Sequence, residues 1–143
     1  MQVFQYGRSG SLTILFSGEI NSLGYSGARL AGVDYNNASG YTLAEMEFLG
    51  GAPQSYTAGA AVSVWLLRCV VSGTYEDGAS GFIPGRAPDV SLPLVSGTSR
   101  TTKMFRLPPE TMRPLFMNIG GVALAASGNL VRLLPRRYES VSG

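Results

Sequence analysis

Residues 60–72 read AAVSVWLLRCVVS, which is the longest apolar run of the chain and holds its only tryptophan and its only cysteine. Four of these residues are valines, and β-branched side chains favour an extended backbone. Glycines flank the run on both sides and Pro53 precedes it. The run therefore predicts a central β-strand. A buried helix is the alternative, because a short apolar run is ambiguous by its period alone.

Both faces of this predicted strand are apolar. Two valines and Leu66 fall on one face, and Trp65 and Leu67 fall on the other. An antiparallel strand with one face in water would instead alternate apolar with polar residues. We therefore expect the strand to be covered twice, by the core on one side and by a further layer on the other. We also expect Trp65 to be buried together with Leu67 and Phe48.

Short strand-like segments separated by turn-forming residues occupy most of the remaining chain. They cover residues 11–16, 27–35, 41–49, 90–95, 100–107, 115–119, 122–126 and 130–138. Pro93 predicts an edge strand, Pro135 predicts that the last strand ends near an edge, and the tail from Ser140 is expected to be loose. Many short strands with Gly and Pro turns, without a βαβ rhythm, predict an all-β, jelly-roll-like β-sandwich. A length of 143 residues suits a single domain over 1–143.

The composition excludes several kinds of chemistry. The chain has no histidine and one cysteine, so it lacks an internal disulfide, a usual zinc site and the Ser-His-Asp or Cys-His nucleophile systems. No phosphate-binding glycine motif is present. These observations predict a protein that is not an enzyme and that uses no cofactor or metal. No apolar run reaches the roughly 20 residues of a membrane span, and the N-terminus lacks a signal-peptide pattern, so we expect a protein made in the cytoplasm, with no membrane partner.

Acidic pairs offer the one enzymatic alternative. Glu45 and Glu47 share a face of the predicted strand 41–49, and Glu76 and Asp77 are adjacent in a loop. Two carboxylates about 5 Å apart resemble a retaining glycosidase pair. However, one strand cannot place two carboxylates on opposite sides of a sugar, and adjacent acids in a loop are typical of turns in contact with solvent. We therefore prefer the structural interpretation.

Charge is distributed unevenly along the chain. Residues 1–99 carry four basic and seven acidic side chains, whereas residues 100–137 carry seven basic ones and only Glu110. Ten of the eleven cations are arginine, the cation preferred at protein interfaces. We predict a partner interface that includes Arg100, Lys103, Arg106, Arg132, Arg136 and Arg137. Nucleic-acid binding is the less favoured explanation of these arginines.

Three groups of segments carry a resemblance to a known class of protein. They are 27–37 with Tyr41; 62–71 running into 73–78; and 107–109, 117–121 and 123–129. In this order they span most of the chain, which resembles the cement or decoration proteins of tailed bacteriophage capsids. The resemblance implies a jelly-roll or related sandwich that clamps neighbouring major capsid subunits on the outer surface of the virion. It implies no catalytic residue.

Two binding functions remain as alternatives. The chain could be a phage tail or baseplate subunit, or a carbohydrate-binding module that uses exposed tyrosines, with candidates at Tyr25, Tyr35, Tyr41, Tyr56 and Tyr75. Low charge and a doubly apolar strand also predict a homo-oligomer, a dimer in preference to a trimer, because two-fold symmetry is the commonest closed arrangement.

Overall fold

A computed structural model of the chain describes residues 2–9, 12–18, 28–30, 34–69, 71, 73–76, 78, 83–97, 100–119, 121–125 and 127–142. Side chains are described for all of these except 2–9, 15–18, 28–30 and 137–142. The described residues form ten strands and no helix. The strands are β1 (Gln2–Ser9), β2 (Thr13–Gly18), β3 (Ala28–Leu30), β4 (Tyr35–Asn36), β5 (Leu43–Leu49), β6 (Ala61–Arg68), β7 (Val90–Pro93), β8 (Arg100–Arg106), β9 (Thr111–Asn118) and β10 (Asn129–Ser142).

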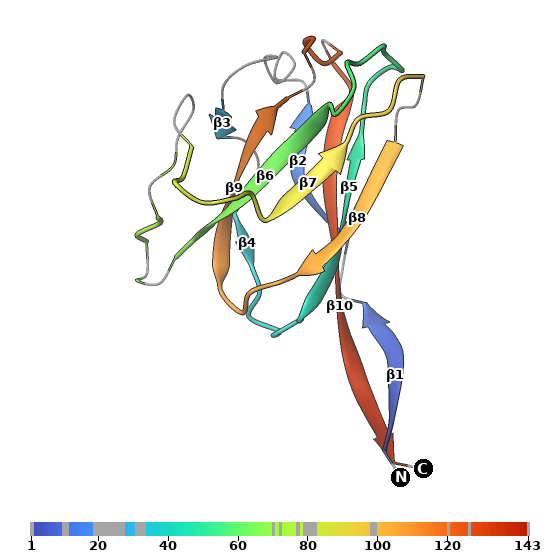
Figure 1. Ribbon diagram of the computed structural model, residues 1–143. Coiled ribbons are helices and arrows are strands. Elements are labelled where there is room, and N and C mark those ends of the chain that lie inside the picture. Colours follow the sequence, from blue (N-terminus) through green and yellow to red (C-terminus); the bar gives the residue numbers. More distant parts are fainter. Residues whose placement is uncertain are drawn as a thin grey trace.

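The strands form two antiparallel sheets that pack face to face as a β-sandwich (Figure 1). Sheet A has the order β1-β10-β5-β8, with β2 also paired to β10, and sheet B has the order β3-β9-β6-β7, with β4 also paired to β9. After β2 the chain passes repeatedly between the sheets, so most neighbouring strands are far apart in sequence. The all-β sandwich expected from the sequence is confirmed, and the strand order is compatible with a jelly-roll-like arrangement.

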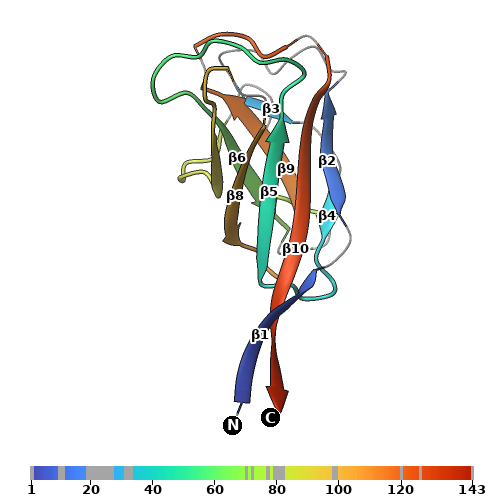
Figure 2. The same cartoon turned by 90° about the vertical axis from the view of Figure 1, so that its right-hand side faces the viewer.

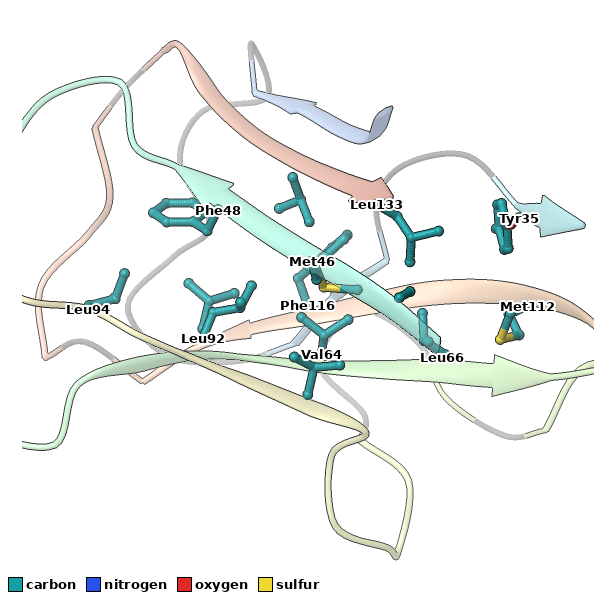
Figure 3. Packing of buried hydrophobic residues seen from close by; sticks show 14 of the residues in the cluster. Tyr35, Met46, Phe48, Val64, Leu66, Leu92, Leu94, Met112, Phe116 and Leu133 are labelled. Atoms are coloured by element: carbon teal, nitrogen blue, oxygen red, sulfur yellow. The ribbon is translucent and has the colours of Figure 1, made fainter. Parts of the chain in front are cut away.

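One hydrophobic core fills the space between the sheets (Figure 3). Its largest fully buried side chains include Phe48 and Met46 from β5, Leu133 from β10, and Phe116 and Leu66 from sheet B. On β5 the buried residues alternate with half-buried ones, as the sequence period predicts. Residues from both sheets belong to the same cluster, so each sheet supplies the apolar face that the other requires.

The central strand β6 has a second, smaller apolar cluster on its outer face. Trp65, Leu67 and Leu115 are buried there, with Tyr75 and Met117 packed against them. The layer above them is the connection between β6 and β7, which supplies Tyr75 and the backbone oxygen that accepts the Trp65 indole hydrogen bond at 2.9 Å. The prediction of a doubly covered strand is therefore confirmed.

Phe48 lies in the main core rather than beside Trp65. The expected contact between these two aromatic residues is wrong, because Trp65 occupies the face of β6 that points away from sheet A.

The last strand is longer than the sequence predicts. Pro135 was expected to lie near its end, but β10 continues to Ser142 by pairing with β1. The prediction of a loose tail from Ser140 is wrong for 140–142. The predicted strand at 122–126 is not formed at 122–125, and residue 126 is outside the described part of the chain. The edge position predicted from Pro93 is confirmed, since β7 ends sheet B.

Candidate interaction surface

The outer face of sheet A carries most of the predicted interface residues. On β5, Glu45 and Glu47 alternate with residues buried in the core. The register places Arg132 opposite Glu47 and Leu134 opposite Glu45 on β10. Because directly opposed residues of an antiparallel pair project from the same side, these four side chains share the outer face, which is the side of β5 and β10 seen in Figure 2.

Exposed apolar side chains surround these charges. Leu12 is 56% exposed, Ile14 on β2 is 48% exposed and Met104 on β8 is 44% exposed. The register places Ile14 opposite Arg132 and Met104 opposite Glu45, so both belong to the outer face. Leu12 lines the same hollow as Glu45 and Arg132. Large apolar side chains that collect on one face mark interaction sites more often than isolated ones do.

Ion pairs across the strands hold the arginines of this face in place. The Arg132 guanidinium binds the Glu47 carboxylate, with Nε to Oε1 at 2.9 Å. Arg100 approaches the other Glu47 oxygen at 3.6 Å, and Arg136 binds Glu45 at 3.0 Å. Both glutamates considered as a glycosidase pair are therefore engaged by arginines in cross-strand ion pairs.

Four of the six predicted interface residues lie together on this face: Arg100, Arg106, Arg132 and Arg136. Arg106 is exposed, and it makes no ion pair with any residue that the structure describes. Lys103 is also exposed but lies opposite the buried Met46, so it belongs to the opposite face of β8. The backbone of Arg137 continues β10, and its side chain is outside the described part of the chain.

The net charge of the outer face is positive but moderate. Its four arginines outnumber its two glutamates by two. A purely phosphate-binding surface would not place carboxylates among its cations, because the contacts to the nucleic acid backbone dominate the binding energy there. A mixture of apolar residues, arginines and acids is instead typical of protein interfaces.

The outer face of sheet B differs because the chain itself covers it. A Cβ atom on Gly78 would lie 2.8 Å from the Leu67 side chain, so the connecting segment packs directly on that face. Arg113 adds a further cover, stacking its guanidinium 4.0 Å from the Tyr75 ring centre. The same arginine binds both carboxylate oxygens of Asp34, at 2.9 and 3.0 Å, and it holds the pKa of Asp34 below its usual value.

The largest charged cluster has a structural role. Beyond Val64, strand β6 has no partner on the β7 side among the described strands. Side chains take the place of that partner: Asp89 accepts from the Leu66 N–H at 2.7 Å, and Arg86 donates to the Leu66 oxygen at 3.2 Å. Glu76 accepts from the Arg68 N–H at 3.0 Å. The cluster satisfies strand groups that would otherwise be unpaired.

Charge pairing within this cluster is strong. Arg86 binds Glu76 through two nitrogens, at 2.6 and 3.1 Å, and Asp89 at 3.0 Å. The hydrogen bonds from Arg86 lower the pKa of Glu76 below its usual value. Of the acidic loop pair considered in the sequence, Glu76 is thus a structural residue, and Asp77 lies outside the described residues.

The tyrosines considered for sugar binding are placed differently from a binding platform. Tyr35 is buried in the core, Tyr41 and Tyr56 pack against it, and Tyr75 covers the outer cluster of sheet B. Tyr25 lies outside the described residues. These four tyrosines are therefore used for packing at scattered positions rather than gathered on one surface.

A shallow hollow on the outer face of sheet A is lined by Leu12, Glu45, Glu47, Thr102, Arg132 and Leu134. Glu47 binds Arg132 and Glu45 binds Arg136 across the strands, so the hollow offers mainly apolar contact. Within the described residues, no group of histidine, cysteine or acidic side chains could hold a metal ion. No helix of the described chain is long and apolar enough to span a bilayer.

Comparison of the chain with known protein families, with curated proteins and with solved structures found no match. The surface itself therefore carries the functional argument. The charge distribution along the chain predicts the arginines of this face, but no sequence pattern groups the apolar residues Leu12, Ile14 and Met104 with them. The signal for that grouping is the cross-strand register, which a single sequence does not reveal.

Proposed function

We propose that this protein is a structural virion protein that binds the outside of a phage capsid and cements neighbouring major capsid subunits. It would bind them through the outer face of sheet A. The observation that carries the proposal is the grouping of Arg100, Arg106 and Arg132 with the exposed Ile14 and Met104 on one uncovered face. Such a surface suits a partly acidic protein partner that also presents apolar contacts.

The mechanism is thermodynamic linkage. A protein that binds only the assembled shell stabilises that state by mass action. Single contacts at the rim of such an interface contribute only about 0–1 kcal/mol each. A shell repeats each contact many times, so small contributions add up over the particle. A rigid sandwich with ordered arginines suits this role because few side chains lose freedom on binding.

A phage tail or baseplate subunit is the second candidate within the same class, because the same face could bind another virion protein. The carbohydrate-binding alternative is less favoured, since Tyr35, Tyr41, Tyr56 and Tyr75 are used in packing. Nucleic acid is disfavoured by Glu45 and Glu47 among the arginines of the face.

The experiment is a binding assay on source-phage capsids assembled without this protein, across a salt series. Wild-type binding should weaken as salt rises, because exposed charges are screened within about 8–10 Å at ordinary ionic strength. Arg100→Glu/Arg106→Glu should bind the shells at least tenfold more weakly, about 1.4 kcal/mol. Lys103→Glu is the control for charge reversal elsewhere, since Lys103 lies on the other face of the same strand.

Three results would contradict the proposal. The first is equal binding of wild type and the arginine variant at every salt concentration. The second is an equal loss of binding in the lysine control, which would show that the loss is not specific to the outer face of sheet A. The third is tight binding of wild type to free DNA, with a steep salt dependence and without binding to shells, which would support the nucleic-acid alternative.

A further inference from the structure

The two ends of the chain form a ribbon that projects from the sandwich (Figures 1 and 2). We call it the terminal ribbon; it consists of β1 and residues 136–142 of β10. Its register runs from Ser9 opposite Arg136 to Gln2 opposite Ser142, with a bulge at Gly7. An isolated two-stranded ribbon is only marginally stable in water, and a third strand or a packed face is needed for independent stability.

The backbone direction shows which groups of β1 face away from β10. The Arg136 oxygen accepts from the Thr42 N–H at 3.2 Å, on the β5 side of β10. Because successive residues of a strand point their backbone groups to opposite edges, 137, 139 and 141 point toward β1. Val3 lies opposite 141 and Gln5 lies opposite 139, so the backbone groups of these two residues point toward β10 and form the hydrogen bonds between the two strands. Gln2, Phe4 and Tyr6 present their N–H and C=O groups on the outer edge.

No described strand pairs with that outer edge. The β7 and β8 edges carry features that prevent pairing with foreign strands. The β8 edge carries three cations over seven residues, and the β7 edge is four residues long and contains Pro93. By contrast, residues 2–7, QVFQYG, contain no charge and no proline and include Val, Phe and Tyr. They combine high strand propensity with an open edge.

We propose that the outer edge of β1 pairs antiparallel with the same edge of a second copy of this chain, about a two-fold axis. A register centred on Phe4 would place Gln2 opposite Tyr6 of the copy and Phe4 opposite itself. All three outward-facing residues would then exchange hydrogen bonds, and the two ribbons would form one four-stranded sheet. A second copy fits this edge because an uncharged segment can face itself without opposing like charges.

This inference does not depend on the proposed function. It concerns self-association through the termini, whereas the capsid proposal concerns the outer face of sheet A. Dimer formation could therefore fail while shell binding holds, and the reverse outcome is equally possible. The experiment below uses the purified full-length chain without any capsid.

The test is sedimentation of the full chain over a wide range of concentration, with Phe4→Pro and Phe4→Val compared. Proline removes an outward N–H while leaving the inner ladder intact, and it is tolerated on edge strands whose N–H side faces solvent. We expect a concentration-dependent dimer whose Kd rises at least about tenfold in Phe4→Pro. Phe4→Val retains the N–H and should dimerise like wild type. Amide exchange at Phe4 and Tyr6 should slow as the dimer forms.

Three results would overturn the inference. The first is a wild-type chain that stays monomeric at every concentration, because no second copy would then pair with the edge. A dimer of unchanged Kd in Phe4→Pro, and in a second variant, Tyr6→Pro, would form through another surface. Equal loss of the dimer in Phe4→Val would assign it to the side chain instead of the strand edge. Unchanged unfolding midpoints of the variants would exclude a folding defect.

Discussion

At the scale of single residues, Trp65 connects the central strand to the layer that covers it. The ring is 3% exposed and its indole nitrogen donates to the Arg86 oxygen. We expect Trp65→Ala to lower the free energy of unfolding by about 3–5 kcal/mol, because it removes a large side chain from a packed site. Denaturant unfolding would measure this, with Leu12→Ala as an exposed control expected to stay within about 0.5 kcal/mol. Equal midpoints for both variants would contradict the placement of Trp65.

A pH effect is expected at Glu76. Its pKa is lowered mainly by the hydrogen bonds from Arg86, so the charged form stabilises the fold. A carboxylate with a lowered folded pKa contributes stability above its unfolded pKa, here 4.5, and loses that contribution as the pH falls toward the folded value. We expect Glu76→Gln to be less stable than wild type at pH 7, and the difference should shrink below about pH 4.5. A difference that stays constant from pH 7 to about pH 3 would contradict this explanation.

At the scale of elements, two prolines inside central strands explain why the sequence did not predict the full lengths of β9 and β10. Pro135 lies between the segment paired to β2 and the segment paired to β1. Counting from Arg136, the backbone groups of β10 alternate between the two edges of the strand. The position of the N–H that Pro135 lacks therefore faces the gap between β2 and β1, so no hydrogen bond of the sheet is lost. Pro114 of β9 lies in the same way between the partners β3 and β4. A proline suggests a strand end only when its N–H edge is occupied.

Local patterns did predict most of the sandwich strands. The period-two pattern of 41–49 and the valine-rich run of 60–72 correspond to β5 and β6. Strand β1 was not predicted, because its only described partner lies at the far end of the chain and its sequence lacks a continuous apolar run. Pairing over such a separation depends on tertiary structure, which overrides local propensity.

The loop that connects β5 to β6 packs closely against the one that enters β10. Gly51 donates its N–H to Asn129 at 3.1 Å, and a Cβ added there would lie 1.8 Å from the Ser127 oxygen. We expect Gly51→Ala to destabilise the protein by at least about 1–3 kcal/mol, because a backbone atom must move. Gly85→Ala is the matched control, since its added Cβ meets no atom within 4 Å. Thermal unfolding of both variants measures the effect, and equal midpoints would show that the two loops are not in close contact.

At the scale of the whole molecule, the two sheets differ in what covers them. The outer face of sheet B is covered by the chain between β6 and β7, whereas the outer face of sheet A presents Leu12, Ile14 and Met104 to solvent. The charge distribution along the sequence predicted the arginines of this face. It did not predict that Glu45 and Glu47 would pair with them, because that pairing depends on the register of β5 against β10.

Apolar contact should matter to binding as much as charge does. We expect Ile14→Glu and Met104→Glu to reduce binding to undecorated shells at least about tenfold, because each replaces an apolar contact of the proposed interface with a charge that must lose its water. Val71→Glu is the matched control, since Val71 is 66% exposed and lies after β6, in the connection to β7. Binding of all three variants at high salt would separate apolar contacts from electrostatic attraction. Unchanged shell binding by both Ile14→Glu and Met104→Glu would show that the outer face of sheet A is not the attachment surface.

Electron microscopy of source-phage capsids, assembled without this protein and then incubated with it, tests the central claim most directly. The predicted result is density for the sandwich on the outer surface, bridging neighbouring subunits, with the outer face of sheet A against the shell and the covered face of sheet B toward solvent. Shells that bind no protein at saturating concentration would contradict the account, and so would a sandwich bound with the outer face of sheet A exposed to solvent.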